Sequence, residues 1–379
     1  MKKLPAFLMT GVFLLTLCSC FPTGKETVAS TDASISVELT DSDHVELTLA
    51  ENLEVQADVH QNKNAPLSKF QASLQEFDFE QVLSSQFANK TITEQYKLEN
   101  AIYPEYFQKT AEFDDGSYLT VNLGELRFAS PLYSDRFYYS EIFEAGYFVR
   151  PNLKQIYKKD HLETVDKSSA IQLVSDAIQA LGISASDTPE VIALDYDTMM
   201  SEWEDFQLRD GSWATPWSEN EEAYAIVYPV QYNGVNITNF GYWNSGKEVF
   251  ALGSRILGVV SEQGLIHLYC TGLYDQIEET ESNVSCISLE AALTQIKKKY
   301  EDILLTDPIT ITNISLEYVP LATDSDSTVF EFVPAWVFDA KQVFNNEAEN
   351  GKEAFQYESN YSVVILAEDG QELKVGAIA

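Results

Sequence analysis

The chain has 379 residues with 24 basic and 59 acidic side chains, which gives a formal net charge of −35 at pH 7. Hydrophobic residues make up 45% of the sequence and aromatic residues 12%, a composition too apolar for a disordered chain. Such an acidic protein repels nucleic acid and anionic lipid headgroups. We therefore exclude a nucleic-acid-binding function. Divalent cations, basic peptides and cationic polymers are electrostatically favoured partners, and the favoured alternative is that the charge serves solubility alone.

The first twenty residues read as a targeting segment. Two lysines precede an apolar run over 7–17, which is too short to span a bilayer as a mature helix. The run ends in Leu17-Cys18-Ser19-Cys20, which resembles a bacterial lipobox. The resemblance implies cleavage of a signal peptide, residues 1–19, and lipidation of Cys20. Diacyl attachment would anchor the protein to the outer face of the cytoplasmic membrane.

Composition and periodicity divide the remaining chain into four segments. Residues 20–33 are rich in Thr, Ser, Gly, Lys and Ala, which is typical of a flexible tether. Period-two alternation and an Asp-Gly hairpin turn predict an N-terminal β-rich domain over 34–151. Two further units, 152–280 and 281–379, each begin with an amphipathic helix and continue with three strands. We therefore predict an α+β fold with two units that each pack a helix on an antiparallel sheet.

This order of elements resembles the PepSY-type and YycH/YycI-type modules of Gram-positive surface proteins. The whole mature chain, with its NLEVQADV segment near the start, resembles an uncharacterised family of Gram-positive lipoproteins. The resemblance implies an extracytoplasmic domain that binds or regulates an envelope protein or peptide. It carries no catalytic motif and identifies no contact residues.

The sequence carries no familiar catalytic motif. His-Glu-x-x-His, Gly-x-Ser-x-Gly and Ser-x-x-Lys are all missing. The segment 241–248 nearly matches a phosphate-binding loop, but Glu248 replaces the Ser or Thr that would reach magnesium. Asp195 and Asp197 are weak candidates for a metal site, because alternate positions on a strand share one face. We expect no cofactor.

Four of the five tryptophans gather in one part of the chain. Trp203, Trp213, Trp217 and Trp243 lie in and after an acidic Gly- and Pro-containing loop. Exposed tryptophans beside carboxylates could stack on sugar rings or bind a cationic peptide. The alternative is that these tryptophans fold over the sheet and fill a satellite core, and this alternative is the favoured one.

Two cysteines remain once Cys18 is removed with the signal peptide and Cys20 is lipidated. Cys270 and Cys286 are separated by fifteen residues, in a compartment that permits oxidation, so a disulfide is one way to pair them. Spacing alone does not establish the pairing.

These observations favour a lipid-anchored, non-enzymatic binding or regulatory protein of the cell envelope. Its partners would be the membrane, through the lipid anchor, and an envelope protein or peptide. The alternative is an extracytoplasmic glycan-binding protein or hydrolase that uses the Trp-rich acidic loop. A solute-binding lipoprotein is disfavoured, because the βαβ alternation of its two lobes is not evident.

Overall fold

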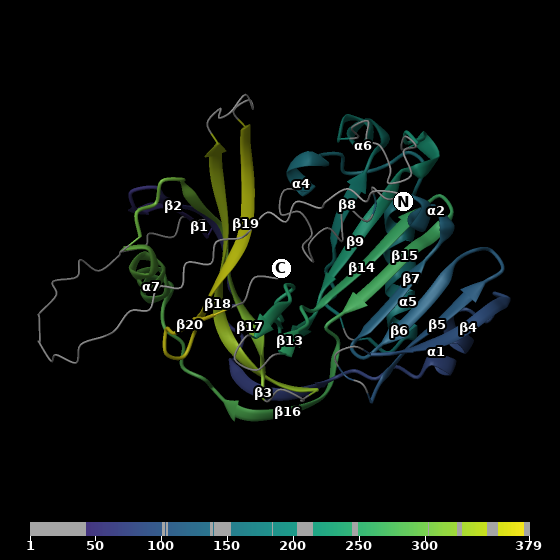
Figure 1. The fold of residues 1–379 in the computed structure, drawn as a ribbon, viewed down its shortest axis with the longest axis horizontal. Coiled ribbons are helices and arrows are strands. Elements are labelled where there is room, and N and C mark those ends of the chain that lie inside the picture. Colours follow the sequence, from purple (N-terminus) through teal and green to yellow (C-terminus); the bar gives the residue numbers. More distant parts are fainter. Residues whose placement is uncertain are drawn as a thin grey trace, which may run out of the picture. The chain divides into compact units, whose positions relative to one another are not determined.

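Two eight-stranded β-sheets organise the computed structural model (Figure 1). They belong to a compact unit that runs from Ile35 to Ala379. The structure describes residues 43–100, 103, 105–136, 139, 153–183, 185–202, 215–244, 249–301, 303–323, 328–346 and 355–374. Cys20 and the predicted tether therefore lie outside the described residues.

The first sheet, here the α5 sheet, is antiparallel throughout, in the order β4-β5-β6-β7-β15-β14-β9-β8. Its strands are β4 (Ile92–Glu99), β5 (Phe107–Phe113), β6 (Tyr118–Asn122), β7 (Glu125–Ala129), β8 (Glu190–Leu194), β9 (Ala223–Pro229), β14 (Arg255–Ser261) and β15 (Gly264–Thr271). Strands from the N-terminal third of the chain thus pair with strands that follow the first predicted helix.

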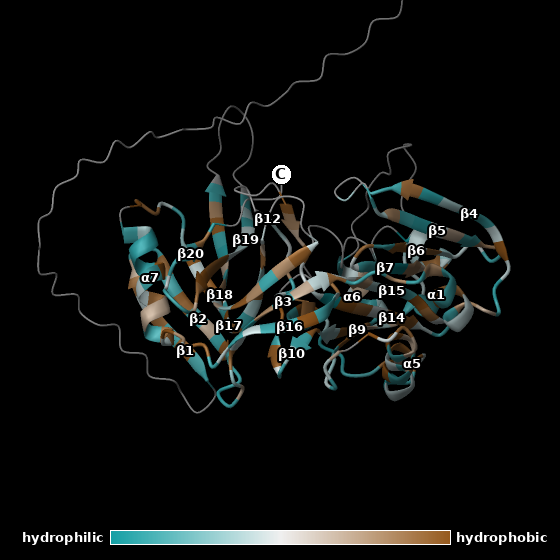
Figure 2. Cartoon of the chain, turned by 90° about the horizontal axis from the view of Figure 1, so that it is seen from below, coloured by the Kyte–Doolittle hydropathy of each residue, from teal (hydrophilic) through white to brown (hydrophobic). Residues whose placement is uncertain are grey.

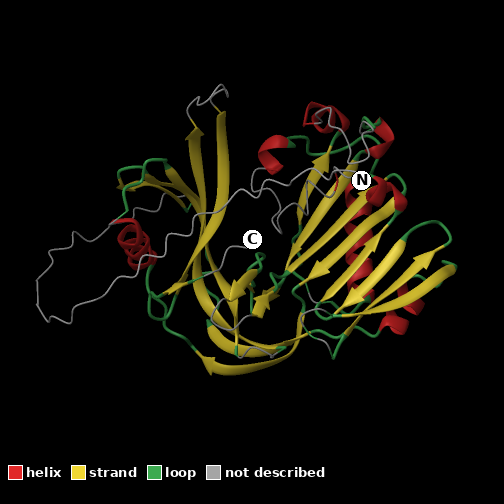
Figure 3. Cartoon of the chain, viewed as in Figure 1, coloured by secondary structure: helices red, strands yellow, loops and turns green. Residues whose placement is uncertain are grey.

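Helices cover both faces of the α5 sheet (Figure 3). One face carries α1 (Phe79–Gln86) and α5 (Lys167–Ala180). Residues of α2 (Pro131–Asp135), α4 (Leu153–Ile156) and α6 (Tyr196–Glu202) pack in the separate cluster on the other face, and a short 3₁₀ turn spans Glu219–Glu221. Alternation along β14 produces the two layers, because Ile256 and Val260 enter the α5 cluster while Leu257 and Val259 enter the opposite one.

The second sheet, here the α7 sheet, has the order β1-β2-β17-β18-β19-β20, and β3 pairs with both β18 and β16. Its strands are β1 (His44–Ala50), β2 (Leu53–His60), β3 (Ser68–Leu74), β16 (Tyr274–Ser282), β17 (Ile309–Ala322), β18 (Val329–Asn346), β19 (Phe355–Leu366) and β20 (Glu372–Leu373). The pairing of β2 with β17 is parallel, whereas the other pairs of this sheet are antiparallel.

One face of the α7 sheet packs against α7 (Leu289–Glu301). Trp336 of β18 anchors this layer, and its Nε1 donates to the carbonyl of Ile287 over 3.1 Å. Two small ribbons complete the strands: β10 (Gln231–Tyr232) with β11 (Val235–Asn236), and β12 (Tyr242–Asn244) with β13 (Val249–Ala251). None of the described helices is long and apolar enough to cross a membrane.

The predicted α+β fold class is wrong, because the structure is mostly β. Both predicted helices exist as α5 and α7, and α7 buries the predicted face formed by Leu289, Ala292, Leu293, Ile296 and Tyr300. The strands after each helix, however, do not form a sheet of their own. They pair with β2, β3 and β7 from the predicted N-terminal domain. Periodicity shows which face of a strand is buried but carries no information about its neighbour.

The contact between α5 and β14 depends on a glycine. Asp166 caps α5 by accepting a hydrogen bond from the Ser169 amide over 2.8 Å, and Gly182 follows the helix at φ +69°. Val174 then lies so close to Gly258 that a Cβ on Gly258 would approach its Cγ2 to 2.4 Å. No side chain larger than hydrogen fits there without moving the helix.

We predict that Gly258→Ala lowers the free energy of unfolding by about 1–3 kcal/mol through overpacking. Val174→Ala should restore space, so the double variant should lose less stability than the two single changes added together. Urea denaturation of the four proteins measures the coupling. Strictly additive losses would contradict the proposed contact.

Candidate functional site

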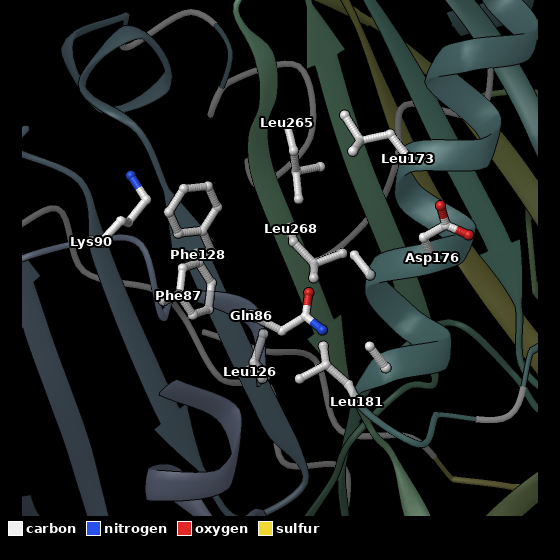
Figure 4. A pocket seen from close by; sticks show the side chains of 12 residues that line it. Gln86, Phe87, Lys90, Leu126, Phe128, Leu173, Asp176, Leu181, Leu265 and Leu268 are labelled. Atoms are coloured by element: carbon white, nitrogen blue, oxygen red, sulfur yellow. The ribbon is translucent and has the colours of Figure 1, made fainter. Parts of the chain in front are cut away.

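An apolar groove lies on the face of the α5 sheet that carries α1 and α5, between these two helices (Figure 4). Its volume is about 430 Å³, within the range of pockets that bind small molecules. The lining residues are Gln86, Phe87, Lys90, Leu126, Phe128, Leu173, Asp176, Ala177, Ala180, Leu181, Leu265 and Leu268. Nine of these twelve side chains are hydrophobic, so the groove suits an apolar ligand.

Helical spacing creates the α5 wall of the groove. Leu173, Ala177, Ala180 and Leu181 recur at intervals of three and four residues and therefore share one side of the helix. Because Ala177 and Ala180 have small side chains, they leave open space between Leu173 and Leu181. A second stripe, formed by Ala170, Val174, Ala177 and Ile178, is buried. The helix thus uses one apolar stripe for packing and leaves the other facing the groove.

The opposite wall comes from the end of α1. Asp78 caps this helix by accepting from the Gln81 amide over 3.1 Å. The Phe87 ring follows the last turn and packs 5.5 Å from Phe113 and 5.1 Å from Phe128, measured between ring centroids. These aromatic contacts fix the wall against the sheet.

A charged residue, Lys90, lies at one end of the groove. Its Nζ donates to the Asp115 carboxylate and, over 3.0 Å, to Ser117 Oγ, and it lies 5.6 Å from the Phe128 ring centroid. Burial acts to raise the pKa of Asp115, but the hydrogen bonds from Lys90 and Ser117 outweigh it and lower the pKa to about 2. The lysine is thereby neutralised by a permanent carboxylate, so it adds little attraction for an anionic ligand.

The sequence did not predict the groove. Its floor comes from β7 and β15, which lie about 140 residues apart in the chain and meet only through sheet pairing. One signal was available: Leu173 occupies a non-core position of the helix with 39% of its surface exposed. An apolar residue on a second face of an amphipathic helix hints at another contact.

The structure places the two described tryptophans of this region in different parts of the fold. Trp217 is only 5% exposed and packs against Tyr139, with ring centroids 4.7 Å apart. Trp243 lies in a different element, β12, and is 38% exposed. Trp203 and Trp213 lie outside the described residues. Trp217 therefore contributes to the core on the second face of the α5 sheet, which is the alternative that the sequence favoured for this loop.

Asp195 and Asp197 do not share a strand face as predicted. Asp195 follows β8 and accepts from the Thr198 amide over 3.2 Å, whereas Asp197 lies in the first turn of α6. Both accept from Lys159 Nζ, at 2.9 and 3.0 Å. Burial acts to raise the pKa of Asp195, but the bonds from Lys159 and Thr198 lower it. Asp195 and Asp197 thus bind the ammonium group of Lys159. Among the described residues, no group of three or more His, Cys, Asp and Glu side chains could hold a metal ion.

The structure keeps Cys270 and Cys286 as free thiols rather than as the disulfide considered from sequence. Cys270 lies in β15 within the core of the α5 sheet, whereas Cys286 packs against the α7 core. The two sulfurs thus belong to different hydrophobic clusters. Burial raises the pKa of both thiols, that of Cys286 to about 11, which disfavours the reactive thiolate.

A polar cluster that the sequence did not predict lies on β17 and β18, on the face opposite α7. Asp339 accepts from Asn313 Nδ2 over 3.0 Å and from Ser362 Oγ over 2.7 Å. Burial raises the pKa of Glu317 to about 7, and the charge of Asp339 acts in the same direction, while the nearby hydroxyl groups of Ser315 and Thr238 oppose it. Glu317 keeps some solvent exposure as a residue, but the surrounding strands desolvate its carboxyl group.

We predict that Glu317 makes stability fall as the pH rises from about 4.5 to about 7. In that window the folded state keeps a proton that the unfolded state releases, so the free energy of unfolding decreases. Glu317→Gln should flatten this dependence, as measured by urea denaturation at several pH values. Glu163→Gln is the control, because that side chain is 94% exposed. Equal slopes in all three proteins would refute the assignment.

Comparison with known proteins defines the fold but not the activity. No protein-family model matches the chain, and no curated protein matches its sequence. The fold is similar to that of the crystal structure of an uncharacterized protein from Eubacterium rectale ATCC 33656, with a TM-score of 0.65 and 15% sequence identity. The match covers 88% of this chain and 94% of that chain. At this identity the similarity concerns the fold alone, and the PepSY-like resemblance stays a prediction.

Proposed function

We propose that this protein is a lipid-anchored, non-enzymatic binding protein that holds the apolar part of a ligand in the groove between α1 and α5. The observation that carries the proposal is the composition of the groove, with nine hydrophobic side chains around about 430 Å³. A concave and mostly apolar lining with a few polar groups is the usual form of a small-molecule binding site.

The chemistry of the lining favours binding over catalysis. Its ionisable members are Lys90 and Asp176. Lys90 is paired with Asp115, and Asp176 is exposed and accepts from Gln172 Nε2 over 2.6 Å. No serine, cysteine or histidine lines the groove, so a nucleophile with an adjacent base is not assembled there.

The proposed location rests on the lipobox-like N-terminus. Removal of residues 1–19 also removes two lysines and leaves a body with a net charge of about −37. Anionic lipid would repel this body. A tether would therefore present the groove to other envelope components, of which basic proteins and peptides are electrostatically favoured.

The proposed lipid anchor at Cys20 is tested by metabolic labelling. The wild type should incorporate radiolabelled palmitate and fractionate with the membrane, whereas Cys20→Ala should lose the label because the acceptor thiol is missing. Cys18→Ala, the matched control, should remain labelled. Equal labelling of Cys20→Ala and the wild type would contradict the assignment.

The groove is tested with the uncharged fluorescent probe N-phenyl-1-naphthylamine. We expect its emission to rise on binding to the wild type, and Ala180→Phe to weaken binding at least about tenfold by filling the groove. Gln179→Phe is the matched control, because it adds the same ring to an exposed neighbouring position of α5 that does not line the groove. Equal binding by both variants would refute the groove as the site.

A further inference from the structure

Strand β4 forms one edge of the α5 sheet and pairs with β5 alone among the described strands. All eight of its residues are exposed. An edge strand presents unpaired backbone N–H and C=O groups, and proteins usually protect such edges with proline, charge or a covering segment. β4 contains no proline, and its charged residues are Glu94, Lys97 and Glu99, so the edge is open to a strand whose side chains complement these charges.

Exposed apolar residues concentrate on this edge, and Figure 2 shows hydrophobic (brown) segments along the β4 ribbon. Four of the ten large hydrophobic residues that are exposed in the described part of the chain lie on β4 and β5: Ile92, Tyr96, Leu98 and Phe107, at 40–54% exposure. Single exposed apolar residues are ordinary, but several at an open sheet edge would contact the side chains of an added strand.

The register divides these four residues between the two faces of the sheet, with Ile92 and Phe107 on the groove side and Tyr96 and Leu98 on the other. A bulge between Ile92 and Glu94 places Ile92 opposite Phe113, a residue of the groove side. Beyond the bulge, Tyr96 lies opposite Thr110 and Leu98 opposite Gln108. Thr110 pairs in turn with Thr120, and Thr120 pairs with Arg127. Arg127 lies between the groove residues Leu126 and Phe128 on β7, so it points to the opposite face. Tyr96 and Leu98 therefore point away from the groove.

Charge on that same face defines the chemistry of a partner. Glu94 lies directly opposite Glu112 in the β4–β5 register. Like charges in opposed positions of a sheet are unfavourable, and a basic side chain beside them relieves the repulsion. The single lysine, Lys97, points to the other face, where its Nζ lies 4.4 Å from the Phe107 ring centroid. A partner strand that complements Glu94, Tyr96 and Leu98 would therefore carry one basic and two apolar side chains at alternate positions.

We propose that β4 binds an extended basic-apolar segment of another protein as a ninth strand of the α5 sheet. In antiparallel pairing the segment would place apolar residues opposite Leu98 and Tyr96 and a lysine or arginine opposite Glu94. Backbone hydrogen bonds would supply affinity, and the alternate side chains would supply selectivity.

A second copy of this chain is a poorer occupant. Two-fold antiparallel pairing of β4 about Lys97 would bring Lys97 opposite its own copy, and pairing about Tyr96 would place Glu94 opposite Leu98. Both arrangements also bring together two bodies of charge −35. A basic segment avoids all of these costs.

The probe for this site is a capped synthetic peptide, Thr-Val-Thr-Val-Thr-Lys-Thr-Lys, with a fluorescent label. We expect it to bind the full-length protein and to slow amide hydrogen exchange over 92–99. A peptide of equal charge with both valines replaced by proline should bind at least about tenfold more weakly, because proline cannot complete the strand. Equal binding of the two peptides would show attraction by charge alone and would overturn the proposal.

Leu98→Lys should weaken binding of the first peptide at least about tenfold, since it removes an apolar contact and adds a like charge. Leu304→Lys is the matched control, because Leu304 is 89% exposed and lies outside this sheet. Both variants should keep the wild-type melting temperature. Sedimentation must show a monomer: a dimer that Leu98→Lys dissociates would assign the edge to a second copy and overturn the proposal.

Discussion

The antiparallel pairing of β7 with β15 is the interaction on which the groove and the continuity of the α5 sheet depend. It aligns Leu126 with Cys270 and Phe128 with Leu268, across more than 130 residues of sequence. The pairing joins the β4–β7 strands to the β15–β8 strands and so makes one sheet of two halves. It also sets Leu126, Phe128 and Leu268 side by side as the floor of the groove. Without it neither the floor nor a continuous α5 sheet would exist.

The groove exists because two helices share one face of this sheet without closing over it. α5 lies on β14 at Gly258, where the missing side chain lets Val174 approach the backbone. α1 ends at Phe87, whose ring packs on Phe113 and Phe128 of the sheet. Ala177 and Ala180 line the space between the two helices, and their side chains are too small to fill it. Apolar surface thus stays open where a larger residue at position 180 would bury it.

Sequence reasoning located elements better than it located their neighbours. The 3.6-residue periodicity predicted α5 and α7, and Asp115-Gly116 predicted the β5–β6 hairpin, in which Gly116 has φ +79°. These features are local, so nearby residues determine them. The fold class failed because it depends on pairings such as β2 with β17. The Trp-rich loop shows the same dependence: Trp217 is a core residue because Tyr139 packs on it, a contact between residues 78 positions apart.

The two proposed sites use opposite faces of one sheet, and the register explains why they need not compete. Phe113 of β5 faces the groove, where Phe87 packs on it. The neighbouring Glu112 faces the other way, opposite Glu94 and on the side of Tyr96 and Leu98. A segment added to β4 would therefore place the side chains that contact Tyr96 and Leu98 away from the groove. An apolar ligand in the groove would touch only the face that carries α1 and α5. The acidic character of the whole chain acts differently at each site. It favours a basic strand at the edge, where carboxylates face each other, and it matters little in a groove whose lysine is already neutralised by Asp115.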